Sequence, residues 1–293
     1  MKKIVLLAII CLIGVSSYVT PSIKGECSQK KLEKLGVIVS IAPLAEWVKS
    51  VGTNKVDVTI LVPPGASPHT YEPKPSQLIK VEKAKIFVKN GAGLEFWANK
   101  IVRINKDILV VDISKGVKLI ELSPKEQKKH HLLKDPHLWL SLRNAKKGVK
   151  EIYEALSKVN PENEEYYRKN MNEYIEKLDA LDKEISKKLK AVKNKKFIVL
   201  HPSWSYFSKD YGLEQIPIER GGKEPGPKYI KKIIDTAREN NIKVVFVEPQ
   251  FNQKSAEVIA REINGRVVSI NPLAEDYLEN MRITVNEFVK WLK

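Results

Sequence analysis

The feature that most constrains the fold of this chain is a run of apolar residues at helical spacing in its second half. The run predicts one helix of roughly 30 residues, because its members recur at steps of three or four. The rest of this segment is charged, so its apolar stripe is narrow. Such a helix is expected to lie across other elements rather than inside a core. The stripe consists of Tyr167, Met171, Tyr174, Leu178, Leu181, Ile185 and Leu189.

Short apolar runs alternate with helical segments on both sides of this helix. Near-continuous apolar runs that are rich in β-branched residues are typical of strands in parallel sheets covered on both faces. We therefore predict an α/β fold of two lobes with parallel-type sheets, spanning residues 35–159 and 194–293 and joined by one long backbone helix at 160–193. The expected strands are residues 36–43, 56–62, 86–89, 108–113, 197–201, 244–247 and 266–270.

The net charge of +16 raises the question of a nucleic-acid or anionic-membrane partner. The lysines, however, stand beside glutamates on expected helix faces, as at Lys183, Glu184 and Lys187, and are not interleaved with aromatic residues in one strip. This pattern favours a solvated surface of mixed charge. We therefore predict no nucleic-acid partner.

The N-terminus predicts export. Two lysines follow Met1, and residues 4–19 are predominantly apolar, which is typical of a secretory signal peptide (1–20) or an N-terminal anchor. A polar stalk (21–34) follows. Cys27 is the one cysteine after this segment, so an intramolecular disulfide is excluded in the cleaved chain and Cys27 becomes a candidate lipid tether. The expected location is periplasmic or at the cell surface.

Three of the five histidines occupy comparable places beside prolines. His69 lies in PPGASPHTYEP after an expected strand, His137 lies in DPHLW, and His201 opens HPSW where another strand ends. Ligands of parallel α/β sheets bind outside the carboxyl ends of the strands. We therefore expect the three imidazoles to converge in the cleft between the lobes. The alternative is three independent surface or capping histidines.

Three converging neutral imidazoles predict a metal site, most naturally for Zn²⁺, completed by a carboxylate or by water. The turn NPLAEDY offers Asn271, Glu275 and Asp276 as fourth-ligand candidates. A neutral amide is a poor zinc ligand and commonly caps a turn. Acids at the start of a helix commonly face its dipole. The fourth ligand therefore stays open between Asn271, Glu275, Asp276 and water.

Accessory roles are assigned to three further residues. Glu72 lies three residues after His69 and is a candidate metal ligand or a candidate hydrogen-bond acceptor for a ligand. His130 and His131 lie in a polar loop and are candidates for transient metal capture, although two solvated side chains are the simpler interpretation.

Several ordered segments resemble the ZnuA/TroA-type family of metal-binding solute-binding proteins of ABC transporters. The resemblance extends over nearly all of the chain after the signal segment. The segments that carry it are PPGASPHTYEPKPSQL, DPHLWLSLRNA, HPSWSYF, GGKEPGPKYI, VVFVEPQFNQKSAEVIARE and NPLAEDYLENMRITVNEF.

This resemblance implies metal held between two lobes with little hinge motion, by His69, His137 and His201. The fourth family position is usually an Asp before a Pro-Leu-like pair, and here it holds Asn271. Dedicated manganese members resemble one another in carrying Glu where this chain has His201, which favours Zn²⁺ as cargo. Mn²⁺, or Fe²⁺, is the alternative within the family.

The expected function is capture of Zn²⁺ outside the membrane and delivery to a membrane ABC permease, by a monomer without enzymatic activity. The rival from another class is a secreted zinc hydrolase, since three histidines and an open position can activate water. The sequence has no HExxH pair, which counts against the rival. An adhesin-like surface protein of the same fold is a third interpretation.

Overall fold

The computed structural model describes residues 34–123, 127, 132–219 and 225–292. The predicted signal or anchor segment, the stalk up to residue 33, Cys27, His130 and His131 lie outside the described residues. Among the helices of the described part, none combines the length and apolar character needed to cross a membrane.

The first lobe contains a four-stranded sheet in the order β2-β1-β3-β4, and all its strand pairs are parallel. The inner strands β1 and β3 are almost wholly apolar, as strands covered on both faces must be. The elements of this lobe are β1 (Leu35–Val39), α1 (Ala42–Gly52), η1 (Thr53–Lys55), β2 (Val56–Ile60), α2 (Pro75–Lys83), β3 (Ile86–Lys89), α3 (Ala98–Ile104), β4 (Leu109–Asp112), η2 (Leu138–Leu140) and α5 (Leu142–Val159).

The second lobe repeats this topology with a parallel sheet in the order β6-β5-β7-β8. Strand β7 has all four residues buried and lies beside β5 near the middle of the sheet. The elements of this lobe are β5 (Lys196–Val199), α7 (Ser205–Tyr211), β6 (Glu214–Pro217), α8 (Pro227–Glu239), β7 (Val244–Val247), α9 (Lys254–Glu262), β8 (Arg266–Ser269) and α10 (Tyr277–Trp291).

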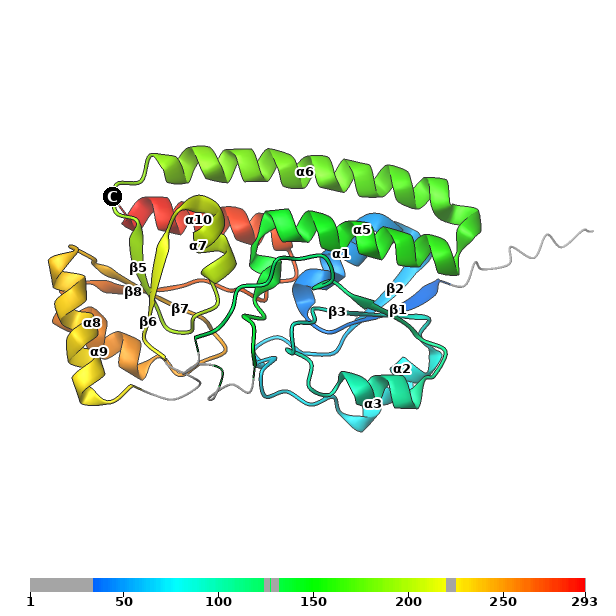
Figure 1. Cartoon of the computed structure of the whole chain (residues 1–293), viewed down its shortest axis with the longest axis horizontal. Helices are drawn as coiled ribbons and strands as arrows, with labels where there is room; N and C mark the ends of the chain where they lie inside the picture. The colour runs from blue at the N-terminus through cyan, green and yellow to red at the C-terminus, as the bar shows by residue number, and fades with distance from the viewer. Residues whose placement is uncertain (1–33, 124–126, 128–131, 220–224, 293) are drawn as a thin grey trace, which may run out of the picture. The chain divides into compact units, whose positions relative to one another are not determined.

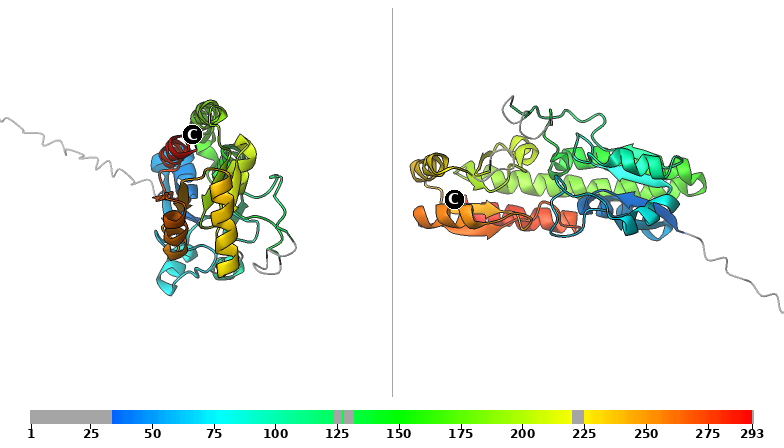
Figure 2. Two further views of the ribbon diagram at one scale, coloured as in Figure 1. Left: turned by 90° about the vertical axis from the view of Figure 1, so that its left-hand side faces the viewer. Right: turned by 90° about the horizontal axis from the view of Figure 1, so that it is seen from below.

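The predicted long helix is α6 (Glu164–Lys190), which follows the short helix η3 (Pro161–Asn163). All seven residues of its predicted apolar stripe are buried, so that prediction is confirmed. Helix α6 packs against α1 and α5 of the first lobe and against α7 and α10 of the second. Figure 1 shows it lying along the helices of both lobes, and Figure 2 shows the same arrangement from two further directions. The predicted fold class, two parallel α/β lobes joined by one long helix, is thereby confirmed.

Two local predictions were wrong. The first strand ends at Val39 rather than at residue 43, and Pro43 lies in the first turn of α1, where its missing N–H costs no hydrogen bond. The strand β6 was not predicted. Its sequence, EQIP, lacks an apolar run, and its proline is tolerated because β6 is an edge strand.

Candidate metal centre

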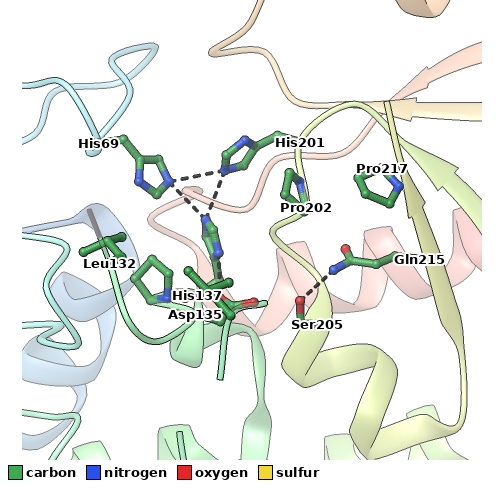
Figure 3. Close-up of a pocket in the computed structure, with 11 residues that line it drawn as sticks. His69, Leu132, Asp135, His137, His201, Pro202, Ser205, Gln215 and Pro217 are labelled. Atoms are coloured by element: carbon green, nitrogen blue, oxygen red, sulfur yellow. Dashed lines mark hydrogen bonds and ion pairs between the residues drawn. The ribbon is translucent and has the colours of Figure 1, made fainter. Parts of the chain in front are cut away.

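The three predicted histidines meet at one point of the structure, although they come from separate loops. His69 lies in the loop between β2 and α2, His137 directly precedes η2, and His201 follows the end of β5 by two residues. Figure 3 shows their imidazoles pointing toward one another. The expected convergence of the three side chains is therefore present in the structure.

The geometry of this triad suits tetrahedral coordination. The Nε2 atoms of His69 and His137 are 3.1 Å apart, and Nε2 of His201 lies 3.3 Å from that of His69 and 3.2 Å from that of His137. A tetrahedral Zn²⁺ with Zn–N bonds of about 2.0–2.1 Å holds its nitrogens about 3.3–3.4 Å apart. The observed distances between the nitrogens therefore agree to within a few tenths of an ångström with those around one tetrahedral Zn²⁺.

Two carboxylates fix which nitrogens of the triad face inward. Nδ1 of His137 lies 2.8 Å from Oδ1 of Asp135, and Nδ1 of His201 lies 2.8 Å from Oε2 of Glu219. A carboxylate only accepts hydrogen bonds, so each Nδ1 carries a proton, and Nε2 is the nitrogen that each ring directs toward the other two histidines. When the Nε2 atoms are unprotonated, lone pairs 3.2 Å apart repel each other unless a cation lies between them.

Asp135 is buried and remains a carboxylate. Burial acts to raise its pKa, but the charge and hydrogen bonds of His137, with a further hydrogen bond from Ser205, outweigh burial and hold the pKa of Asp135 below its ordinary value. The same carboxylate also accepts the backbone N–H of His137 at 2.9 Å. Asp135 therefore fixes both the backbone and the ring orientation of His137.

A second buried acid supports the loop of His201. Glu248 is fully buried and accepts hydrogen bonds from the backbone N–H of His201 at 3.2 Å and from the hydroxyl of Ser203 at 3.0 Å. Burial raises the pKa of Glu248 to about 8, against the opposing effect of these hydrogen bonds. Glu248 thus anchors the turn that follows β5.

The turn after β3 supports the other side of the site. The side-chain amide of Asn90 donates to the carbonyl of Pro136, directly before His137, at 2.8 Å. Glu95 closes this turn, because its two carboxylate oxygens accept the backbone N–H groups of Asn90 at 2.7 Å and Gly91 at 3.0 Å. The loop of His137 therefore rests on a turn that a buried carboxylate holds together.

The predicted fourth-ligand turn is held by other interactions. Oδ1 of Asn271 accepts hydrogen bonds from the side-chain amide of Gln250 at 2.9 Å and from the backbone N–H of Leu273 at 3.0 Å. This is the turn-capping role that an Asn at such a place commonly has. Asp276 directly precedes α10, and its carbonyl accepts the backbone N–H of Asn280 at 2.9 Å.

The remaining acidic candidates pair with lysines at the surface. Glu275 forms an ion pair with Lys49, and Glu72 lies 3.0 Å from Nζ of Lys100. Across the described His, Cys, Asp and Glu residues, the group that has metal-ligand spacing consists of His69, His137 and His201 alone.

Sequence reasoning missed the two carboxylate partners of the histidines. Asp135 carried a local signal, since it stands two residues before His137 in DPH. Glu219 carried none, because it lies 18 residues after His201 and reaches that residue only through the pairing of β5 with β6.

Comparison with known proteins places this geometry in a family. The model of the family described as "Zinc-uptake complex component A periplasmic" (ZnuA) matches residues 37–291. The high-affinity zinc uptake system protein ZnuA of Bacillus subtilis (strain 168) is 34% identical over 275 residues, which cover 90% of this chain and 86% of that protein. The manganese ABC transporter substrate-binding lipoprotein PsaA of Streptococcus mitis is 34% identical over 245 residues, covering 79% and 78%.

A crystal structure of ZnuA matches with a TM-score of 0.85 and 37% identity, covering 89% of this chain and 100% of that one. These matches include both lobes and α6. They set the hydrolase interpretation aside, because the family consists of metal-binding transport proteins. The chain belongs to the ZnuA family, the extracytoplasmic metal-binding components of ABC uptake systems.

Proposed function

We propose that this protein captures Zn²⁺ outside the membrane and delivers it to a membrane ABC permease. The observation that carries the proposal is the triad of Nε2 atoms 3.1–3.3 Å apart. In two of the three rings, a buried or nearly buried carboxylate accepts the Nδ1 proton, so that Nε2 faces the other ligands. Three imidazole nitrogens at this spacing form a binding site for a metal cation. Zinc uptake is also what the family description and the Bacillus subtilis relative name.

The proposed ligands are His69, His137 and His201, with water in the fourth position. No Asp or Glu of the described residues joins the triad at ligand distance. Asn271 uses its side-chain oxygen for two hydrogen bonds, which supports a structural role. Glu72, His130 and His131 are proposed as accessory residues outside the coordination sphere.

The donor set favours zinc over manganese. Three imidazole nitrogens suit Zn²⁺, whereas Mn²⁺ prefers carboxylate, carbonyl and water oxygens. The Streptococcus mitis relative, whose name assigns it to manganese, keeps Mn²⁺ as the second candidate. Zinc and manganese offered together at equal concentration to the metal-free protein decide between them, with elemental analysis of the bound metal as the measurement.

The proposals on assembly, partner and anchoring rest on three separate observations. All three proposed ligands come from one chain, which supports a functional monomer. Lysines pair with acids one helical turn away, as Lys188 does with Glu184 and Lys231 with Asp235, which supports a solvated surface without a nucleic-acid partner. A membrane tether through the N-terminus or Cys27 is proposed from the sequence of residues 1–27.

Replacing His69 with alanine tests the site directly. The variant is expected to bind zinc roughly 10²- to 10³-fold more weakly, since a structural zinc site gains about 10–16 kcal/mol from about four ligands. Chelator competition on the metal-stripped protein measures the affinity. The variant with both His130→Ala and His131→Ala is the matched control and is expected to keep the wild-type affinity. Unchanged affinity in His69→Ala would refute the assignment.

Zinc affinity is expected to fall steeply in acid. A ligating imidazole must be neutral, and the ordinary pKa of histidine is about 6.5, so protons compete with zinc below that pH. Because three imidazoles compete, affinity approaches a loss of about a thousandfold per pH unit well below it. Chelator competition between pH 5 and pH 8 measures this slope. A flat profile would exclude histidine ligation.

The carboxylates that accept the Nδ1 protons of His137 and His201 are expected to contribute to zinc affinity. Asp135→Asn and Glu219→Gln should each weaken zinc binding by about 10- to 100-fold, because the neutral amide lowers the basicity of the imidazole and no longer fixes its tautomer. Asp107→Asn, at an exposed position, is the matched control. Equal affinities in all three variants would show that the carboxylates only stabilise the fold.

A further inference from the structure

The triad opens onto a cavity that is larger than one water molecule requires. All three imidazoles line a cavity of about 230 Å³, whereas a water molecule occupies about 30 Å³ of the liquid. Other faces of the rings are covered, since Phe251 stacks on His201 with ring centroids 4.5 Å apart and Trp139 packs against His137 at 5.4 Å. The cavity is therefore the open side of the proposed metal site.

The wall of this cavity is mainly apolar. Leu122 and Leu132 come from the loop that leads to His137, and Pro202 and Pro217 come from the second lobe. Apolar walls of this kind favour an organic group over a cluster of water molecules. The cavity thus suits a ligand that carries an aliphatic portion.

Polar side chains mark one end of the same cavity. The Gln215 side chain donates through Nε2 to Oγ of Ser205 at 2.6 Å and accepts the backbone N–H of Trp204 at 3.0 Å. Figure 3 shows Ser205 and Gln215 across the cavity from the triad. Pockets for small molecules commonly combine a few such fixed polar groups with apolar walls.

Coordination chemistry narrows the class of ligand. Three nitrogens leave zinc one open position in tetrahedral geometry and two in five-coordinate geometry. An α-amino acid supplies an amine nitrogen and a carboxylate oxygen spaced to fill both positions, and its carboxylate is attracted by the cation. Its side chain would then lie against the leucines and prolines of the wall.

We propose that the site binds zinc together with a small α-amino acid, which coordinates the metal through its amine and carboxylate and places its side chain in the cavity. This rests on the proposed function and extends it, because the cargo then includes zinc complexes of amino acids as well as the free ion. In the absence of an amino acid the site still binds zinc, and water occupies the open coordination position.

The test uses the Co²⁺-loaded protein with L-leucine and glycine as probes. The visible spectrum of Co²⁺ reports its coordination number and ligands, and equilibrium dialysis counts bound metal and amino acid. Leucine is expected to change the spectrum while cobalt stays bound, one leucine per metal. Its half-saturating concentration should be at least tenfold below that of glycine, as burial of an aliphatic side chain allows.

Two variants fill the cavity without touching the proposed ligands. Leu122→Trp and Leu132→Trp are expected to bind cobalt like the wild type but to lose the response to leucine. Ile283→Trp, at an exposed position of α10, is the matched control and should respond normally. An unchanged spectrum, loss of cobalt on adding leucine, or a normal response in both filled variants would overturn the proposal. A wild-type protein that binds neither cobalt nor zinc would instead overturn the proposed function.

Discussion

Saturating Zn²⁺ is expected to raise the free energy of unfolding by about 4 kcal/mol when free zinc exceeds the dissociation constant a thousandfold. The gain arises because zinc binds the folded chain, in which the three Nε2 atoms are assembled, and relieves the repulsion between their lone pairs. Urea unfolding with and without a chelator measures it. Removing the metal should lower the urea midpoint without changing the slope of the transition.

The variant His137→Ala is expected to lose about 3–4 kcal/mol of this zinc-induced gain, as a 10²- to 10³-fold weaker site would. It should also be less stable without metal, because buried Asp135 loses one of its hydrogen-bond donors, the imidazole N–H of His137. The quantity to compare between variants is therefore the increase in the free energy of unfolding that zinc produces in each one. His131→Ala, which removes a histidine outside the triad, should retain the full gain. A full gain in His137→Ala would contradict the proposed ligand set.

Removal of Glu95, which lies away from the triad, is expected to destabilise the fold. Glu95→Ala removes the acceptor of the Gly91 backbone N–H and leaves the Asn90 backbone N–H only the longer bond to Oγ of Ser40 at 3.3 Å, in a buried turn, which should cost about 3 kcal/mol of stability. Glu95→Gln keeps one acceptor and should cost about half as much. Glu279→Ala, at an exposed position of α10, is the control and should cost less than about 1 kcal/mol.

The stability contributed by Glu95 should also depend on pH. Burial raises the pKa of Glu95 above its ordinary value, against its hydrogen bonds and the nearby Lys89 charge. The folded state therefore binds more protons than the unfolded state between the ordinary and the raised pKa. Its contribution is largest below the ordinary pKa and declines as the pH rises through that window. The pH profile of Glu95→Gln should be flatter there, and an identical profile would contradict this role.

The sequence contained enough information for the architecture because apolar periodicity is a local signal. The stripe from Tyr167 to Leu189 on α6 needed only its spacing to be recognised, and every member is buried. Strand β7 is a continuous apolar run and β3 is apolar up to its last residue, Lys89, and the predicted bounds of both agree with the structure. The loops of His69, His137 and His201 were recognisable because prolines accompany each histidine.

Other parts of the structure left no local signal. Strand β6 is formed by pairing with β5 and contains Glu214, Gln215 and Pro217, which individually disfavour a strand. The position of β6 brings Glu219 to His201. Because the strand was not predicted, the carboxylate partner of this histidine was not predicted either. Such long-range pairing depends on the whole sheet and not on the residues of one segment.

The distance along the chain between the three ligands determines when the protein can acquire metal. His69 and His137 are 68 residues apart, and His137 and His201 are 64 residues apart. Closing a flexible loop of that length costs about 3–4 kcal/mol of chain entropy, and an unfolded chain would have to close two. The unfolded polypeptide is therefore a poor chelator, and metallation follows folding. The ion that first occupies the site is then drawn from the compartment in which the chain completes its folding, which for an extracytoplasmic protein is the same medium that it samples for cargo.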